Sequence, residues 1–83
     1  MGNRKKLYNY ISELLKRENI DNLKEYNERT IAISVLGLGY FENVRNIFKH
    51  CGYKISSMSD NKRWNILLEV IRKVVDYNAK ENN

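Results

Sequence analysis

Apolar residues recur at helical spacing in the first part of the chain. Between residues 3 and 18 one stripe is formed by Leu7, Ile11, Leu14 and Leu15. Residues three and four apart lie on the same face of a helix, so this spacing predicts an amphipathic helix with the stripe facing a core.

The stretch from 60 to 78 has the longest helical pattern. Ser59 and Asp60 stand before it as N-caps. The core-facing positions are Trp64, Leu67, Leu68, Ile71, Val74 and Val75. A second apolar strip on a neighbouring side is formed by Ile66, Val70 and Tyr77. A helix this apolar packs at the centre of a bundle or against a second subunit, so we predict a dimer or partner interface at this strip.

Residues 39 to 53, GYFENVRNIFKHCGY, predict a shorter helix with two different sides. The apolar side carries Tyr40, Val44, Ile47, Phe48 and Cys51. The polar side carries Asn43, Arg45, Asn46, Lys49 and His50. Gly52 suits the left-handed position beyond a helix end, which would let Tyr53 fold back near Phe48.

Residues 22 to 36 are compatible with two structures. Asn22 and Glu25 form a plausible capping pair, and a helix after them would bury Leu23, Tyr26, Thr30 and Ile33, with Ile31 and Val35 beside that face. The run TIAISVLGL is rich in β-branched residues, so a strand over 30–36 is the alternative. The charged stretch NLKEYNER leads into it without a turn signal, which favours the helix.

These elements predict one all-α domain spanning residues 1–83, a small bundle of about four helices. The absence of proline and the presence of only four glycines agree with helices joined by short turns. If 30–36 were a strand, the domain would be α+β. We expect the tail 79–83 to fray.

Net charge favours an anionic partner. The chain carries +5 at pH 7, with a pI near 9.4. Arg4, Lys5 and Lys6 begin one predicted helix, and Lys62 and Arg63 begin another. Cations there oppose the helix dipole by about 0.3–1 kcal/mol each, and a bound phosphate would remove this repulsion. The alternative is that Lys and Arg are simply good helix formers on a salt-screened surface.

The two helices around the GLG turn at 37–39 have the layout of a helix-turn-helix. In that geometry the second helix enters the major groove of DNA, so Asn43, Arg45, Asn46 and Lys49 would meet base edges. No register along 28–48 satisfies every position of the usual motif, and the same turn joins helices in other small bundles.

Catalytic chemistry has little support. His50 and Cys51 are neighbours, yet adjacent helical residues point about 100° apart and cannot act as a pair. One histidine and one cysteine fall short of the four ligands of a zinc site. GLGYFE matches only two glycines of a dinucleotide fingerprint. We therefore predict no enzyme activity, catalytic residue, metal, cofactor or small-molecule substrate.

The chain has no stretch of about 20 apolar residues and no signal-peptide core, and its one cysteine suits a reducing compartment. We expect a cytoplasmic protein. Contact of the basic first helix with an anionic membrane face is a third and weaker alternative. Asn, Lys, Ile, Tyr and Phe supply 37 of the 83 residues, a bias typical of a low-GC bacterium or its phages and mobile elements.

We predict a binding protein, and foremost a nucleic-acid-binding regulator. Phosphate contacts would come from Arg4, Lys5, Lys6, Lys62 and Arg63. The alternative is a protein-directed inhibitor or adaptor that docks on an acidic surface of a host nucleic-acid-handling complex, as anti-CRISPR proteins do. Its interface would be anchored by Tyr8, Tyr10, Tyr53 or Tyr77, since tyrosine is frequent among hot spots.

Overall fold

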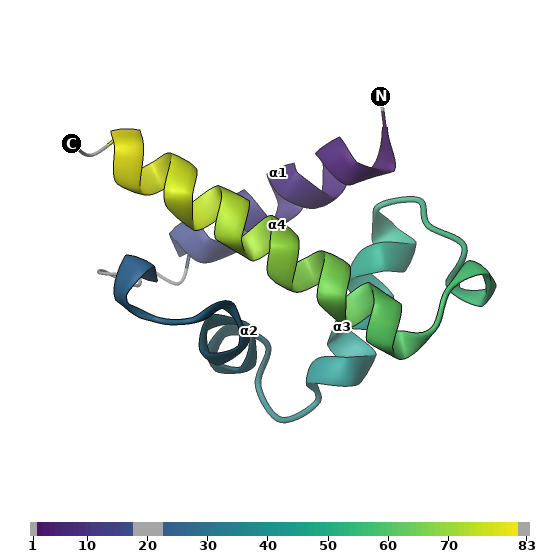
Figure 1. Ribbon diagram of the computed structural model, residues 1–83. Coiled ribbons are helices and arrows are strands. Elements are labelled where there is room, and N and C mark those ends of the chain that lie inside the picture. Colours follow the sequence, from purple (N-terminus) through teal and green to yellow (C-terminus); the bar gives the residue numbers. More distant parts are fainter. Residues whose placement is uncertain (1, 18–22, 82–83) are drawn as a thin grey trace.

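The computed structural model describes residues 2–17 and 23–81, with the backbone alone for 79–81, and all regular elements in these ranges are helical. The α-helices are α1 (Asn3–Arg17), α2 (Glu28–Leu36), α3 (Tyr40–His50) and α4 (Asp60–Glu81), with short 3-10 turns η1 (Leu23–Glu25) and η2 (Ile55–Ser57) (Figure 1). The predicted all-α bundle is confirmed. The alternative of a strand over 30–36 is wrong, because α2 covers these residues.

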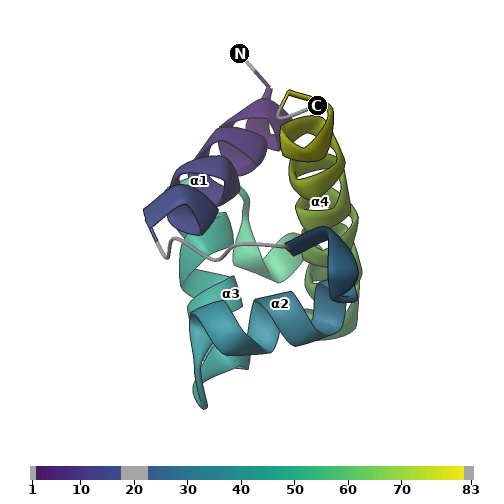
Figure 2. The same cartoon turned by 90° about the vertical axis from the view of Figure 1, so that its left-hand side faces the viewer.

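Helix α4 is the central element of the bundle. It runs across α1, α2 and α3 and contacts each of them more than they contact one another (Figures 1 and 2). Its buried apolar side chains are Trp64, Leu67, Val70, Ile71, Val74 and Val75. The three smaller helices therefore share one apolar partner instead of packing as a compact trio.

This arrangement corrects the interface predicted on α4. Val70 is only 2% exposed and belongs to the core, and Ile66 is half-buried against it. Of the predicted strip only Tyr77 is exposed. The broad apolar surface of α4 is explained by the three helices that surround it, so it does not require a second subunit.

Helix α2 begins later than the sequence suggests. Its N-cap is Asn27, whose Oδ1 accepts a hydrogen bond from the Thr30 N–H at 2.8 Å. The predicted cap Asn22 lies outside the described residues. Because η1 is separate from α2, the two do not share a continuous face. The buried residues of α2 are Ile31 and Ala32, whereas the predicted core position Ile33 is exposed.

The end of α3 has the predicted left-handed turn. Gly52 has φ +94°, and the Tyr53 N–H donates to the Phe48 carbonyl at 3.0 Å. The rings of Phe48 and Tyr53 lie 4.8 Å apart, as expected for a chain that folds back. Asn3 Nδ2 then donates to the Gly52 carbonyl at 3.4 Å, which joins the beginning of α1 to the end of α3.

Helix α4 begins with the cap that the sequence indicated. Ser59 Oγ accepts a hydrogen bond from the Lys62 N–H at 3.2 Å, and Asp60 lies in the first turn.

Across the described ranges, no helix has both the length and the apolar character needed to cross a bilayer.

Candidate functional site

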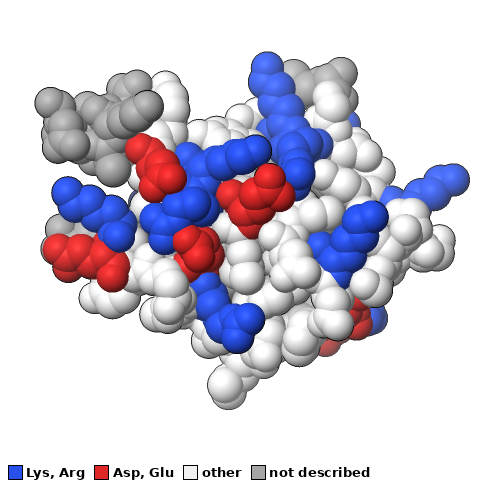
Figure 3. Space-filling model, viewed as in Figure 1, with Lys and Arg blue, Asp and Glu red and all other residues white. Residues whose placement is uncertain are grey.

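Most charges on the outer face of α4 are neutralised by ion pairs. Glu69 accepts from Arg4 of α1 at 3.3 Å and from Lys73 at 3.6 Å, while Arg72 bonds Glu28 of α2. The hydrogen bond from its own backbone N–H, and then the bond from Arg72, lower the pKa of Glu28. Acidic and basic side chains accordingly interleave over the C-terminal half of α4 (Figure 3). Arg4, predicted to contact phosphate, already has a carboxylate partner.

Arg63 is an internal residue, which corrects its predicted role as a phosphate contact. Its side chain is 4% exposed and donates to the carbonyls of Ile55 at 2.9 Å and Met58 at 2.7 Å, and to the carboxylate of Asp60. Arg45 approaches the same carboxylate at 3.4 Å. The hydrogen bond from Arg63, with that from Arg45, lowers the pKa of Asp60. The guanidinium of Arg63 holds the loop before α4 and is not available to a ligand.

The cations at the beginning of α1 have a favourable environment within the protein. The hydrogen bond of Asn3 brings them beside the end of α3, and helix C-termini carry partial negative charge. Burial raises the pKa of the Cys51 thiol, and the positive charge of the nearby Lys6 offsets part of that rise. The C-terminal end of α3 therefore offsets part of the repulsion inferred from the sequence.

Several exposed lysines nevertheless make no ion pair with any described residue. Lys5 and Lys6 belong to the first turns of α1, Lys49 to the last turn of α3, and Lys54 follows that helix closely. Because the beginning of α1 contacts the end of α3, this junction gathers positive charge without acidic partners among the described residues. Lys62, in the first turn of α4, is exposed and unpaired in the same sense.

The polar side chains of α3 do not form the single outward row that the sequence suggested. Asn43 Nδ2 donates to the Leu36 carbonyl at the end of α2, at 2.7 Å. The His50 ring packs edge-on against Tyr10 of α1, with centroids 5.4 Å apart. Arg45 pairs with Asp60 on another side of the helix. Of the predicted groove contacts, only Asn46 and Lys49 are exposed without a polar partner among the described residues.

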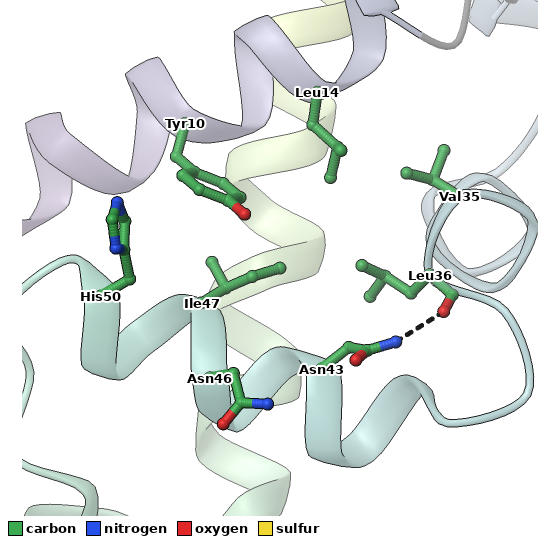
Figure 4. Close-up of a pocket in the computed structure, with 8 residues that line it drawn as sticks. All are labelled: Tyr10, Leu14, Val35, Leu36, Asn43, Asn46, Ile47 and His50. Atoms are coloured by element: carbon green, nitrogen blue, oxygen red, sulfur yellow. Dashed lines mark hydrogen bonds between the residues drawn. The ribbon is translucent and has the colours of Figure 1, made fainter.

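An open cleft of about 360 Å³ lies where α1, α2 and α3 diverge (Figure 4). It is lined by Tyr10, Leu14, Val35, Leu36, Asn43, Asn46, Ile47 and His50. The Tyr10 ring extends from α1 into the cleft toward Ile47, and Asn43 and His50 border it from α3 (Figure 4). Sequence patterns did not predict this cleft, because it depends on the spacing of three helices.

The described residues offer binding contacts but no recognisable reactive centre. Cys51 is buried, and desolvation raises the pKa of its thiol, which keeps it protonated and a poor nucleophile. His50 is directed toward Tyr10 and not toward a nucleophile. Within 2–17 and 23–78, no three His, Cys, Asp or Glu side chains converge as metal ligands.

A second exposed feature is the apolar corner between α2 and α3, formed by Ile33, Leu38 and Phe41. Leu38 is fully exposed and Phe41 is 48% exposed. The Phe41 ring lies 4.6 Å from Tyr40 and 6.1 Å from Trp64, so it continues an aromatic cluster outward from the core. A leucine between Gly37 and Gly39, in a three-residue turn, was the sequence signal for this corner.

Comparisons of the chain with protein-family models, with curated proteins and with solved structures gave no match. The function proposed for this protein therefore rests on the geometry of its described residues.

Proposed function

We propose that this protein is a non-enzymatic nucleic-acid-binding regulator, and that the junction of α1 and α3 contacts the phosphate backbone. The observation that carries the proposal is the gathering of Lys5, Lys6, Lys49 and Lys54 at that junction, where none pairs with a described carboxylate. Lysines of this kind bind phosphates by displacing condensed counterions, which supplies affinity without sequence preference.

The charges also argue against the usual helix-turn-helix orientation on duplex DNA. That orientation would direct the beginning of α3 toward base edges. The exposed side chains at this end are Leu38, Phe41 and Glu42, which offer no cation for a phosphate. Asn43 is turned toward Leu36 and away from the outer face. The end of α3, with Lys49, is the more favourable end for an anionic partner.

Salt dependence tests the proposal directly. Fluorescence anisotropy would follow a labelled single strand, and a duplex of the same sequence, at about 50 and 200 mM salt. We expect affinity to fall steeply with salt, and the slope of log K against log salt to decrease by about 0.7 for each single-strand phosphate contact removed. The informative variant is Lys6→Gln with Lys49→Gln, which removes two unpaired cations.

The matched control is Lys16→Gln with Lys73→Gln. It changes net charge equally, but these lysines lie near Glu13 at 3.9 Å and Glu69 at 3.6 Å. We expect its slope to stay close to that of the wild type. Equal losses in both double variants would show a response to net charge alone, and no complex at the lower salt would exclude nucleic-acid binding altogether.

One observation favours a second candidate function, a protein-directed inhibitor or adaptor. The apolar corner exposes Leu38 completely beside Phe41, and aromatic residues in such patches often anchor protein interfaces. Under this alternative, Leu38→Ser with Phe41→Ser abolishes capture of a defined protein from the native host. The Lys6→Gln, Lys49→Gln variant would still capture it.

A further inference from the structure

The cleft beside the lysine junction contains polar groups that the protein itself does not use. The Tyr10 hydroxyl, the Asn46 amide and the His50 imidazole make no hydrogen bond with any described residue. Tyr10 is half-buried and Asn46 and His50 are exposed, so a ligand with hydrogen-bonding edges can replace solvent as their partner in this cleft.

Asn43 is held in one orientation at the edge of this cleft. Only an N–H can donate to the Leu36 carbonyl, so the 2.7 Å bond fixes Nδ2 on that side and Oδ1 on the other. The amide keeps Oδ1 as an acceptor and a second N–H as a donor. An oriented amide with both groups can pair with the edge of a base such as adenine.

The remaining walls of the cleft are apolar and aromatic. Leu14, Val35, Leu36 and Ile47 surround the space into which Tyr10 projects (Figure 4). A flat ligand with an apolar face and a polar edge matches this lining better than an ion or a sugar does. Tyr10 is half-buried, and the part of its ring that borders the cleft offers a stacking surface for an unpaired base.

Positive charge lies beside the cleft. Lys6 precedes Tyr10 by about one helical turn on α1, and Lys49 is adjacent to His50 on α3. Resting on the function proposed above, we propose that the cleft receives one base of a single-stranded nucleic acid, stacked on Tyr10 and hydrogen-bonded at its edge by Asn43. Lys6 and Lys49 then contact the flanking phosphates. A base in a duplex is stacked and paired, so only an unpaired base enters.

A strand without bases separates this inference from simple phosphate binding. Anisotropy would compare oligo-dA with an abasic strand of equal length, which keeps every phosphate. We expect wild-type protein to bind oligo-dA about 5- to 100-fold more tightly. We expect Tyr10→Leu, which removes the stacking ring but keeps an apolar side chain, and Asn43→Ala, which removes the edge contact, to reduce that ratio. Asn65→Ala, on the exposed side of α4, is the control and should not change it.

The outcomes distinguish the two proposals. Equal, salt-sensitive binding of both strands would overturn the cleft inference and leave the phosphate-binding function intact. No binding of either strand would overturn both. An unchanged ratio in Tyr10→Leu and Asn43→Ala would also place the base elsewhere and overturn the inference.

Titration of adenosine by NMR distinguishes a base within a strand from a free nucleoside. For a strand site we expect weak adenosine binding that shifts the amide signals of residues 43–50, and much tighter binding of oligo-dA. Adenosine that binds as tightly as the strand would identify a nucleoside site and overturn the assignment to a strand.

Discussion

The outer face of α4 and the junction of α1 with α3 both carry basic side chains, but these side chains have different partners. On this face, Lys73 and Arg72 of α4 and Arg4 of α1 each have a carboxylate partner. At the junction, Lys6 and Lys49 have none among the described residues. Net charge alone would not separate these two regions. The presence or absence of a nearby carboxylate does.

The comparison extends to the uncharged polar groups. Around α4, Arg63 donates to the carbonyls of Ile55 and Met58, so these polar groups of the loop before the helix already have partners and form a closed network. Around the cleft, Tyr10 and Asn46 keep unused hydrogen-bonding capacity. A closed network stabilises the fold, whereas an open one has capacity left for a ligand. Substitutions on the two sides should therefore affect different measurements.

Among the substitutions around α4, Arg63→Ala should have the largest effect on the free energy of unfolding. It removes the donor for two carbonyls and leaves a void beneath the loop that contains η2. We expect the free energy of unfolding to fall by about 2–4 kcal/mol, measured by urea denaturation with circular dichroism. Lys62→Ala, one residue earlier and exposed, should change it by no more than about 0.5 kcal/mol. A loss of nucleic-acid affinity in folded Arg63→Ala protein would contradict the division between the two regions.

Gly52→Ala tests the turn that joins the two cationic helix ends. Gly52 has φ +94°, and an added Cβ would lie 3.0 Å from Asn3 Oδ1. We expect a loss of about 1–2 kcal/mol in unfolding free energy, because a side chain is strained in this backbone region. Gly39→Ala is the control, since φ is −89° there and no atom lies within 4 Å of the new Cβ. Equal losses in both variants would show that the turn has no special role.

Local signals in the sequence predicted the parts of the fold that depend on neighbouring residues. The apolar spacing located α1, α3 and α4, and Gly52 and Ser59 marked a helix end and a helix start. Helix α2 was less well predicted, because the pattern did not show that the chain turns before Asn27.

Features that join distant segments had no comparable signal. Glu28 and Arg72 are 44 residues apart, and each resembles an ordinary solvent-facing charge in its own helix. Arg63 stands four residues before Leu67, so spacing puts it on the buried face, but nothing in the sequence shows that the carbonyls of Ile55 and Met58 accept from its guanidinium. The cleft similarly requires residues from three helices. Sequence reasoning identified Asn43, Asn46 and His50 as polar, but not that they line one cleft together with Tyr10.

The smallest expected effect concerns how the stability contributed by the Glu28–Arg72 ion pair depends on pH. The pKa of Glu28 is lowered in the folded protein from an ordinary 4.5, chiefly by its backbone hydrogen bond and then by Arg72. A carboxyl with a lowered pKa stabilises the fold above its unfolded value, and this stabilisation is lost as pH falls through the folded value. We expect Glu28→Gln to lose about 0.2–1 kcal/mol at neutral pH, the range of a partly exposed ion pair.

Urea midpoints measured from pH 7 downward would show the gap between wild type and Glu28→Gln closing below about pH 4.5. Glu25→Gln is the control, because Glu25 is exposed and pairs with no described residue, so its curve should follow the wild type. A gap that stays constant with pH would mean that Glu28 acts through packing alone. Packing would then stabilise the contact between α2 and α4, and the opposite charges of Glu28 and Arg72 would contribute little to stability. The difference between this face of α4 and the junction of α1 with α3 would then be only that its cations have carboxylate partners and the lysines of the junction have none.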